Sequence, residues 1–429
     1  MKKILILSIL AIATTSLLGQ VSDFEKRLFE LPDVIFEKSQ DLENGTAYEL
    51  RIKQPLDHDD HSKGHFYQKA YLHHVDYDKP TVIVTEGYSC YRHRAYEITD
   101  MLNANQIQVE HRFFGKSMPD SLEYQYLNIT QATADYHHIR QLFDQIYTGK
   151  WISTGISKGG ATTIFYKYLH PEDVDVSMPY VAPINDEYEE DRIYEFLNTV
   201  GTAECRAKLY EVQKRLLENR TSILPLVKFY TKGAGAKFSY LAFEQAFEFS
   251  ILEYPFSFWQ WGGDCATIPD NTVNLDSTLS HFLAVSDITF FGDKAMETYA
   301  SHYYQSAEEF GYYGYETEPF KGLLKTFPEG KNPHAAFTPD HMEVPFNGKL
   351  LKSLNKWLKK KGNNMIYIYG ANDTWSASAV PPSDKVNSVW FMMKDKSHGD
   401  ARIKNMTEAE KQKLHTTLSE WLDMDIPSE

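Results

Sequence analysis

Cysteine is scarce in this sequence, with three residues among 429. Cys90, Cys205 and Cys265 are too few for a disulfide-stapled scaffold. In an exported protein, either one disulfide between Cys205 and Cys265 or three buried thiols would fit this number. Neither Cys-x-x-Cys nor His-Glu-x-x-His occurs, so the sequence supports no zinc site and indicates no cofactor.

Long basic runs and long apolar runs are also missing. The net charge is −15, and no stretch of Lys and Arg is long enough to follow a phosphate backbone, which argues against nucleic acid as a partner. The apolar run 4–12 is shorter than the about 20 residues of a membrane span, so no stable membrane insertion is expected. Lys2 and Lys3 precede this run and small residues follow it. We therefore predict a signal peptide over 1–20 and a protein exported to the periplasm or beyond.

Apolar, β-branched segments alternate with helical ones in the first half of the chain. The segments 47–55 and 66–77 alternate like an opening hairpin. Further strands are expected at 80–87, 105–115, 150–157 and 175–183. Helical spacing separates the later strands, and buried strands that alternate with helices favour a parallel sheet covered on both faces.

The alternation of expected strands and helices stops near residue 185 and resumes near 341. Between them the chain is aromatic and mostly helical, and a loop rich in Pro, Gly and Asn marks the return. Strands are expected again at 364–370 and 388–394, followed by a helix that Thr407 begins. We therefore predict an α/β-hydrolase fold with an inserted helical cap. Its parts are the signal peptide 1–20, the first core segment 21–184, the cap 185–340 and the second core segment 341–429.

A Gly-x-Ser-x-Gly pattern places Ser157 at the junction of an expected strand and an expected helix. This is the context of a nucleophile elbow, because Gly155 and Gly159 leave room for the tight turn that exposes the serine hydroxyl. The backbone N–H of Lys158 would then donate to an oxyanion from the helix N-terminus. The N–H of Tyr88, after Gly87, is the expected second oxyanion donor.

A serine nucleophile needs a base and an acid, which in this fold follow in the order Asp, His at the ends of later strands. Asp373 follows the strand 364–370, and His398 follows the strand 388–394. Asp395 and Asp400 compete with Asp373 for the acid role. Glu86, beside the expected oxyanion loop, is either a turn residue or a substrate contact.

Two long motifs resemble a known family of serine peptidases. They are GISKGGATTIFYKYLHPEDVDVSMPYVAP, around Ser157, and VEHRFFGKSMP, at 109–119. Both are similar to the secreted bacterial prolyl tri- and tetrapeptidyl aminopeptidases, which are related to lysosomal prolyl carboxypeptidase and its dipeptidyl-peptidase relative. QPLDH, at 54–58, resembles an N-terminal motif of the wider group, although Asp59 stands where that group continues with Phe. The resemblance implies cleavage after proline near a free N-terminus, with Ser157, Asp373 and His398 as the triad.

Such an activity needs flat apolar walls for proline and a carboxylate for the substrate's ammonium group. Aromatic candidates in the cap are Phe256, Phe258, Trp259 and Trp261, of which Trp259 and Trp261 are our choice together with Glu86. Carboxylate candidates are Glu187, Glu189, Glu190 and Asp264. The competing functions are a carboxylesterase or lipase on the same fold and an inactive hydrolase fold that only binds a partner.

Overall fold

The computed structural model describes residues 22–328 and 333–426, so the predicted signal peptide lies outside the described residues. The chain forms one nine-stranded sheet of order β1-β2-β3-β5-β4-β6-β7-β8-β9. Its strands are β1 (Val34–Leu42), β2 (Gly45–Pro55), β3 (His65–His74), β4 (Thr81–Thr85), β5 (Asn105–Val109), β6 (Trp151–Ile156), β7 (Val176–Tyr180), β8 (Ile366–Gly370) and β9 (Val389–Met393). In the order of the sheet, neighbouring strands from β5 to β9 are parallel. At the other edge, β1, β2 and β3 pair antiparallel with one another, and β3 pairs antiparallel with β5.

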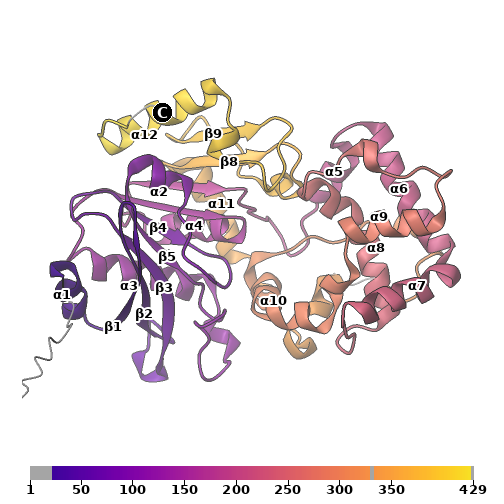
Figure 1. Ribbon diagram of the computed structural model, residues 1–429, viewed down its shortest axis with the longest axis horizontal. Helices are drawn as coiled ribbons and strands as arrows, with labels where there is room; N and C mark the ends of the chain where they lie inside the picture. Colours follow the sequence, from indigo (N-terminus) through magenta and orange to yellow (C-terminus); the bar gives the residue numbers. More distant parts are fainter. Residues whose placement is uncertain (1–21, 329–332, 427–429) are drawn as a thin grey trace, which may run out of the picture.

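Helices cover both faces of this sheet (Figure 1). They are α1 (Asp23–Glu30), α2 (Glu97–Leu102), α3 (Ile129–Phe143), α4 (Lys158–Leu169), α11 (Lys349–Lys361) and α12 (Glu408–Leu422). Alternate residues of one strand serve the two faces: Val82 and Val84 pack with α2 and α12, whereas Ile83 packs with α3. The arrangement confirms the predicted α/β-hydrolase fold class.

The hairpin expected from 47–55 and 66–77 is present as β2 and β3, whereas β1 and α1 were not expected from the pattern. The strand expected over 105–115 is shorter and ends at Val109. The reason is the next residue: the buried Glu110 carboxylate accepts the backbone N–H groups of Cys90, Lys116 and Ser117 at 2.7–2.8 Å. These bonds fold the chain back on itself where the strand would continue.

The remaining family motif residues hold the hairpin against α3. The Arg112 guanidinium binds both carboxylate oxygens of the buried Asp135, at 2.8 and 2.7 Å. His58 Nε2 lies 2.8 Å from the same carboxylate. Gln54 Nε2 donates to Gln68 Oε1 and to the carbonyl of Asp135. The polar residues of QPLDH and VEHRFFGKSMP therefore have a structural role, and they fix the loop that follows β5.

Between β7 and α11 the described chain contains helices and short turns but no named strand, and it forms a separate body beside the sheet (Figure 1). Its helices are α5 (Arg192–Thr199), α6 (Ala203–Glu218), α7 (Arg220–Gly233), α8 (Phe243–Gln260), α9 (Leu275–Val285) and α10 (Asp293–Gln305). We call this body the cap. None of the helices in the described part of the chain is both long and apolar enough to cross a membrane.

Two features stabilise the cap. A disulfide joins Cys205 to Cys265, while Cys90 is a free, buried thiol, so of the two alternatives open from the sequence the structure has the disulfide. Helix α8 continues through Pro255, which has no N–H for the carbonyl of Ile251 four residues earlier. Gln213 Nε2 of α6 donates to that carbonyl at 2.7 Å, which satisfies the acceptor that proline leaves open.

Candidate active site

Ser157 lies on the sharp turn between β6 and α4, with φ 59° and ψ −125°. A non-glycine residue adopts this conformation only under strain, which is the mark of a nucleophile elbow. A Cβ at Gly159 would lie 2.4 Å from the carbonyl oxygen of Thr85, and one at Gly155 would lie 2.4 Å from that of Gly159. Only glycine fits at both positions, so the local sequence dictates the turn that presents the serine.

The structure brings His398 and Asp373 together, as their order in the sequence predicts. Asp373 begins the turn after β8 and His398 follows β9. His398 Nδ1 lies 2.7 Å from Asp373 Oδ2, and both side chains are buried. Of the two competing carboxylates, Asp400 accepts a hydrogen bond from Ser397 Oγ at 2.6 Å instead. Asp373 is thus the carboxylate that orients the imidazole.

The two expected oxyanion donors lie on adjacent segments. Lys158 is the first residue of α4, so its N–H is one of the amides that a helix leaves free at its N-terminus. A Cβ at Gly87 would lie 2.7 Å from the backbone nitrogen of Gly159, which shows how closely the loop after β4 approaches α4. This contact places Tyr88 next to the elbow.

The Lys158 side chain stabilises the loop after β4 through hydrogen bonds. Its Nζ donates to the carbonyl of Gly87 at 2.8 Å and to Gln305 Oε1 of α10 at 2.7 Å. Burial lowers the pKa of Lys158 well below its ordinary value. The side chain therefore connects the oxyanion loop with the cap, a role that the motif alone did not indicate.

Ser157 and His398 line one cavity of about 690 Å³ between the core and the cap. Its lining includes Glu86 and Tyr88 from the loop after β4 and Trp261 at the end of α8. The Trp261 ring meets the His398 ring edge to face, with centroids 5.9 Å apart. Glu86 Oε1 accepts from Tyr96 Oη and Gln108 Nε2, at 2.7 and 2.8 Å, so this carboxylate is already engaged.

Trp259 is not in this cavity. It is 4% exposed and packs in the cap core, where its ring lies against Gly201. Helix α8 explains the difference, because at about 100° per residue two positions apart face nearly opposite ways. Phe256 and Phe258 are likewise buried in the cap core, and Glu187, Glu189, Glu190 and Asp264 do not line the cavity.

Sequence reasoning missed two acidic residues of the cavity wall, Asp287 and Glu253, of which Glu253 lies on α8. The Glu253 carboxylate accepts hydrogen bonds from Ser257 Oγ, Tyr313 Oη and Tyr315 Oη at 2.8–2.9 Å. The available signal was an acidic residue in a mostly apolar helical segment, 243–260. Glu248 stands in the same segment, so the pattern could not separate it from Glu253.

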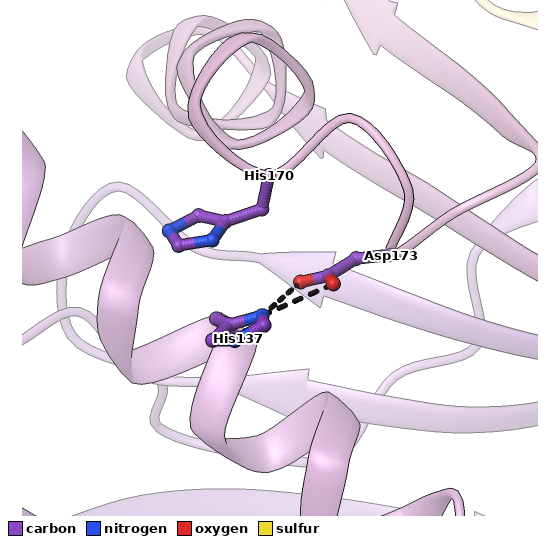
Figure 2. A group of neighbouring side chains, drawn as sticks. All are labelled: His137, His170 and Asp173. Carbon is purple, nitrogen blue, oxygen red and sulfur yellow. Dashed lines mark hydrogen bonds and ion pairs between the residues drawn. The ribbon is translucent and has the colours of Figure 1, made fainter.

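Outside the cavity, three side chains of types that bind metal ions lie close together: His137, His170 and Asp173. His137 of α3 lies 2.8 Å from Asp173, and His170 stacks on His137 (Figure 2). An imidazole lone pair lies in the ring plane, and these two planes are 14° apart with centroids separated by 4.4 Å. One ion cannot lie in both planes unless a ring turns. Asp173 also accepts from Tyr166 Oη at 2.8 Å, so this arrangement is typical of a structural contact.

Comparison with known proteins supports the resemblance seen in the motifs. The family model described as PS-10 peptidase S37 matches residues 19–424. The prolyl tri/tetrapeptidyl aminopeptidase of Streptomyces mobaraensis is 30% identical over 366 residues, which are 84% of this chain and 76% of that protein. The crystal structure of a Mycobacterium smegmatis proline iminopeptidase covers 87% of this chain and 97% of its own at 12% identity and a TM-score of 0.39, too low to inform function. Because the family match spans almost the whole chain, the protein belongs to the peptidase S37 family and is a serine peptidase.

Proposed function

We propose that this protein is a secreted exopeptidase that cleaves after proline and releases tri- or tetrapeptides from free N-termini. The observation that carries the proposal is a cavity lined by cap residues, by the strained Ser157 and by His398, whose imidazole is held by the buried Asp373. The name of the Streptomyces relative supports the same specificity. The Cys205–Cys265 disulfide supports export, because disulfides persist in oxidising compartments.

The proposed mechanism follows from the His398–Asp373 contact and from the position of Ser157 in the same cavity as His398. His398 accepts the Ser157 proton at Nε2 while its Nδ1–H donates to Asp373, which holds the required tautomer. The serine oxygen attacks the carbonyl carbon of the proline residue, and the N–H groups of Lys158 and Tyr88 donate to the resulting oxyanion. His398 then gives its proton to the leaving amine. Water repeats these steps to release the acyl product and restore the serine.

Proline recognition is assigned to the aromatic side of the cavity next to the oxyanion loop. Proline offers no N–H and presents an apolar ring, so flat aromatic walls suit it. The Tyr88 ring lies edge-on to Phe114, Tyr299 and His302, with centroids 5.4–5.8 Å apart. All four side chains line the cavity. We propose these four side chains, in place of Trp259, as the contacts for the proline ring. Trp261, beside His398, remains a further candidate.

Three substrates test the proposal: a prolyl tripeptide with a free amine, its N-acetyl form with the same leaving amine, and a short acyl ester. The free-amine peptide should have the highest kcat/KM, and a fluorophosphonate should label Ser157. Preference for the ester by a large factor would instead support a carboxylesterase or lipase. Absence of labelling, with the fold intact, would support an inactive hydrolase fold that only binds a partner.

A further inference from the structure

We propose that Glu253 binds the N-terminal ammonium group of the peptide substrate. This inference rests on the exopeptidase function proposed above and names the group that would make a free amine necessary. Glu253 lies on α8 of the cap, and it lines the same cavity as Ser157 of the core. A substrate bound at both residues would therefore reach from its amine to its scissile bond within this one cavity.

The surroundings hold the Glu253 carboxylate in place without neutralising it. Tyr313 and Tyr315 both donate to Oε2 at 2.8 Å, and Ser257 donates to Oε1 at 2.9 Å. These hydroxyls fix the orientation of the carboxylate but bring no positive charge. A carboxylate oxygen accepts about two hydrogen bonds, so Oε1 has room for one more donor.

The other buried carboxylate of α8 and the two other carboxylates that line the cavity already have partners. Glu248, five residues earlier on α8, is bound by Arg220 and by the backbone N–H groups of 325–327. Glu86 binds Tyr96 and Gln108 and lies 3.4 Å from Arg94. Asp287 is only half-buried and caps a turn by accepting the N–H of Thr289.

Glu253 differs from all three. It is 5% exposed, and no cation pairs with it among residues 22–328 and 333–426. An unpaired buried carboxylate is costly, and a primary ammonium supplies both the charge and the donors it lacks. The geometry therefore suits a substrate cation better than a structural role alone.

Burial raises the pKa of Glu253 to about 7, although its three hydroxyl donors oppose this shift. The other titratable groups around it and its tyrosine partners are Tyr303, Tyr312, Tyr313, Tyr315, His302 and His334. Burial raises the pKa of each of these tyrosines and lowers that of each of these histidines. Glu253 is therefore the group among them that changes charge near neutral pH.

The affinity of Glu253 for an ammonium group should therefore increase with pH. As pH rises through about 7, Glu253 loses its proton and gains affinity for an ammonium group. A peptide α-amino group stays charged until about pH 7.7–8.0. Binding of a free-amine peptide should therefore strengthen from about pH 5.5 to about pH 7.5, whereas binding of its N-acetyl form should not follow this rise.

The test measures how product tripeptides ending in proline protect Ser157 from fluorophosphonate labelling. Each peptide is used with a free amine and with an N-acetyl group, on wild type, Glu253→Gln and, as a control, Glu187→Gln, which changes an exposed carboxylate outside the cavity. In wild type and in the control, the free-amine form should bind about 30-fold more tightly or better, the effect of one buried charge pair. Glu253→Gln should remove this preference, and the control Glu187→Gln should be labelled at the wild-type rate without peptide.

The experiment distinguishes failure of the Glu253 assignment from failure of the proposed function. If Glu253→Gln keeps the preference for a free amine, or lowers the affinity for both peptide forms equally, the assignment of Glu253 is wrong while the proposed function stands. If neither form protects wild type although the fluorophosphonate labels it, the proposed function itself is wrong. The pH dependence of protection in wild type gives an independent reading that needs no variant, and a flat ratio of the two peptide forms between about pH 5.5 and about pH 7.5 would also overturn the assignment.

Discussion

Replacing Asp373 with asparagine changes one atom at the buried contact that orients the proposed base. His398 Nδ1 now lies 2.7 Å from Asp373 Oδ2, which must accept the imidazole N–H. An asparagine can present its NH₂ group to Nδ1 instead, and the imidazole then carries its proton on Nε2. An Nε2–H cannot accept the proton of Ser157. The expected loss in kcat is about 10⁴-fold, or about 5 kcal/mol of transition-state stabilisation.

The assay compares kcat for a free-amine prolyl peptide substrate between wild type and the variant. Asparagine keeps the oxygen that accepts the Trp375 N–H, at 3.1 Å in the wild type, so the thermal unfolding temperature should change little. Asp400→Asn is the matched control, because Asp400 lies two residues after His398 and bonds Ser397 instead. An Asp373→Asn variant with more than about a tenth of wild-type kcat would refute the role of the pair, and so would an equal loss in Asp400→Asn.

Three further substitutions test the fold around the site. Replacing Cys205 and Cys265 with alanine frees a loop of 60 residues and should lower the free energy of unfolding by about 4 kcal/mol; urea denaturation that shows no change would contradict this. Gly159→Ala puts a methyl group 2.4 Å from a backbone carbonyl oxygen of β4 and should cost about 1–3 kcal/mol and slow fluorophosphonate labelling; wild-type labelling would contradict the tight elbow. Arg112→Met leaves the buried Asp135 carboxylate without its guanidinium and should cost about 3–5 kcal/mol in urea denaturation, and a loss below about 1 kcal/mol would contradict that estimate.

The core could be predicted well because its signals are local. Gly155 and Gly159 fix the turn at Ser157, because a Cβ at either position would clash with a backbone carbonyl oxygen of α4 or β4. The proximity of Asp373 and His398 could be predicted because parallel strands end at one edge of the sheet, so residues that follow two neighbouring strands meet there. Alternating apolar residues likewise indicated the sheet, although the end of β5 depends on Glu110, whose partners lie in separate loops.

The substrate side could not be predicted in the same way because its contacts are distant in sequence. Trp259 and Trp261 are two residues apart, yet one packs in the cap core and the other lies beside His398. The choice depends on where α8 ends and which side of it faces the core. The Glu253 carboxylate is oriented by hydrogen bonds from Tyr313 and Tyr315, which lie about sixty residues later in the sequence. No periodic pattern connects these positions.

The most direct test of the proposed specificity is mass spectrometry of the products from a peptide library with free N-termini and proline at positions two to five. Wild type should release peptides of three or four residues that end in proline, and Ser157→Ala should release none. Cleavage that ignores proline, cleavage far from the N-terminus, or equal products from an N-acetylated library would contradict the proposed function.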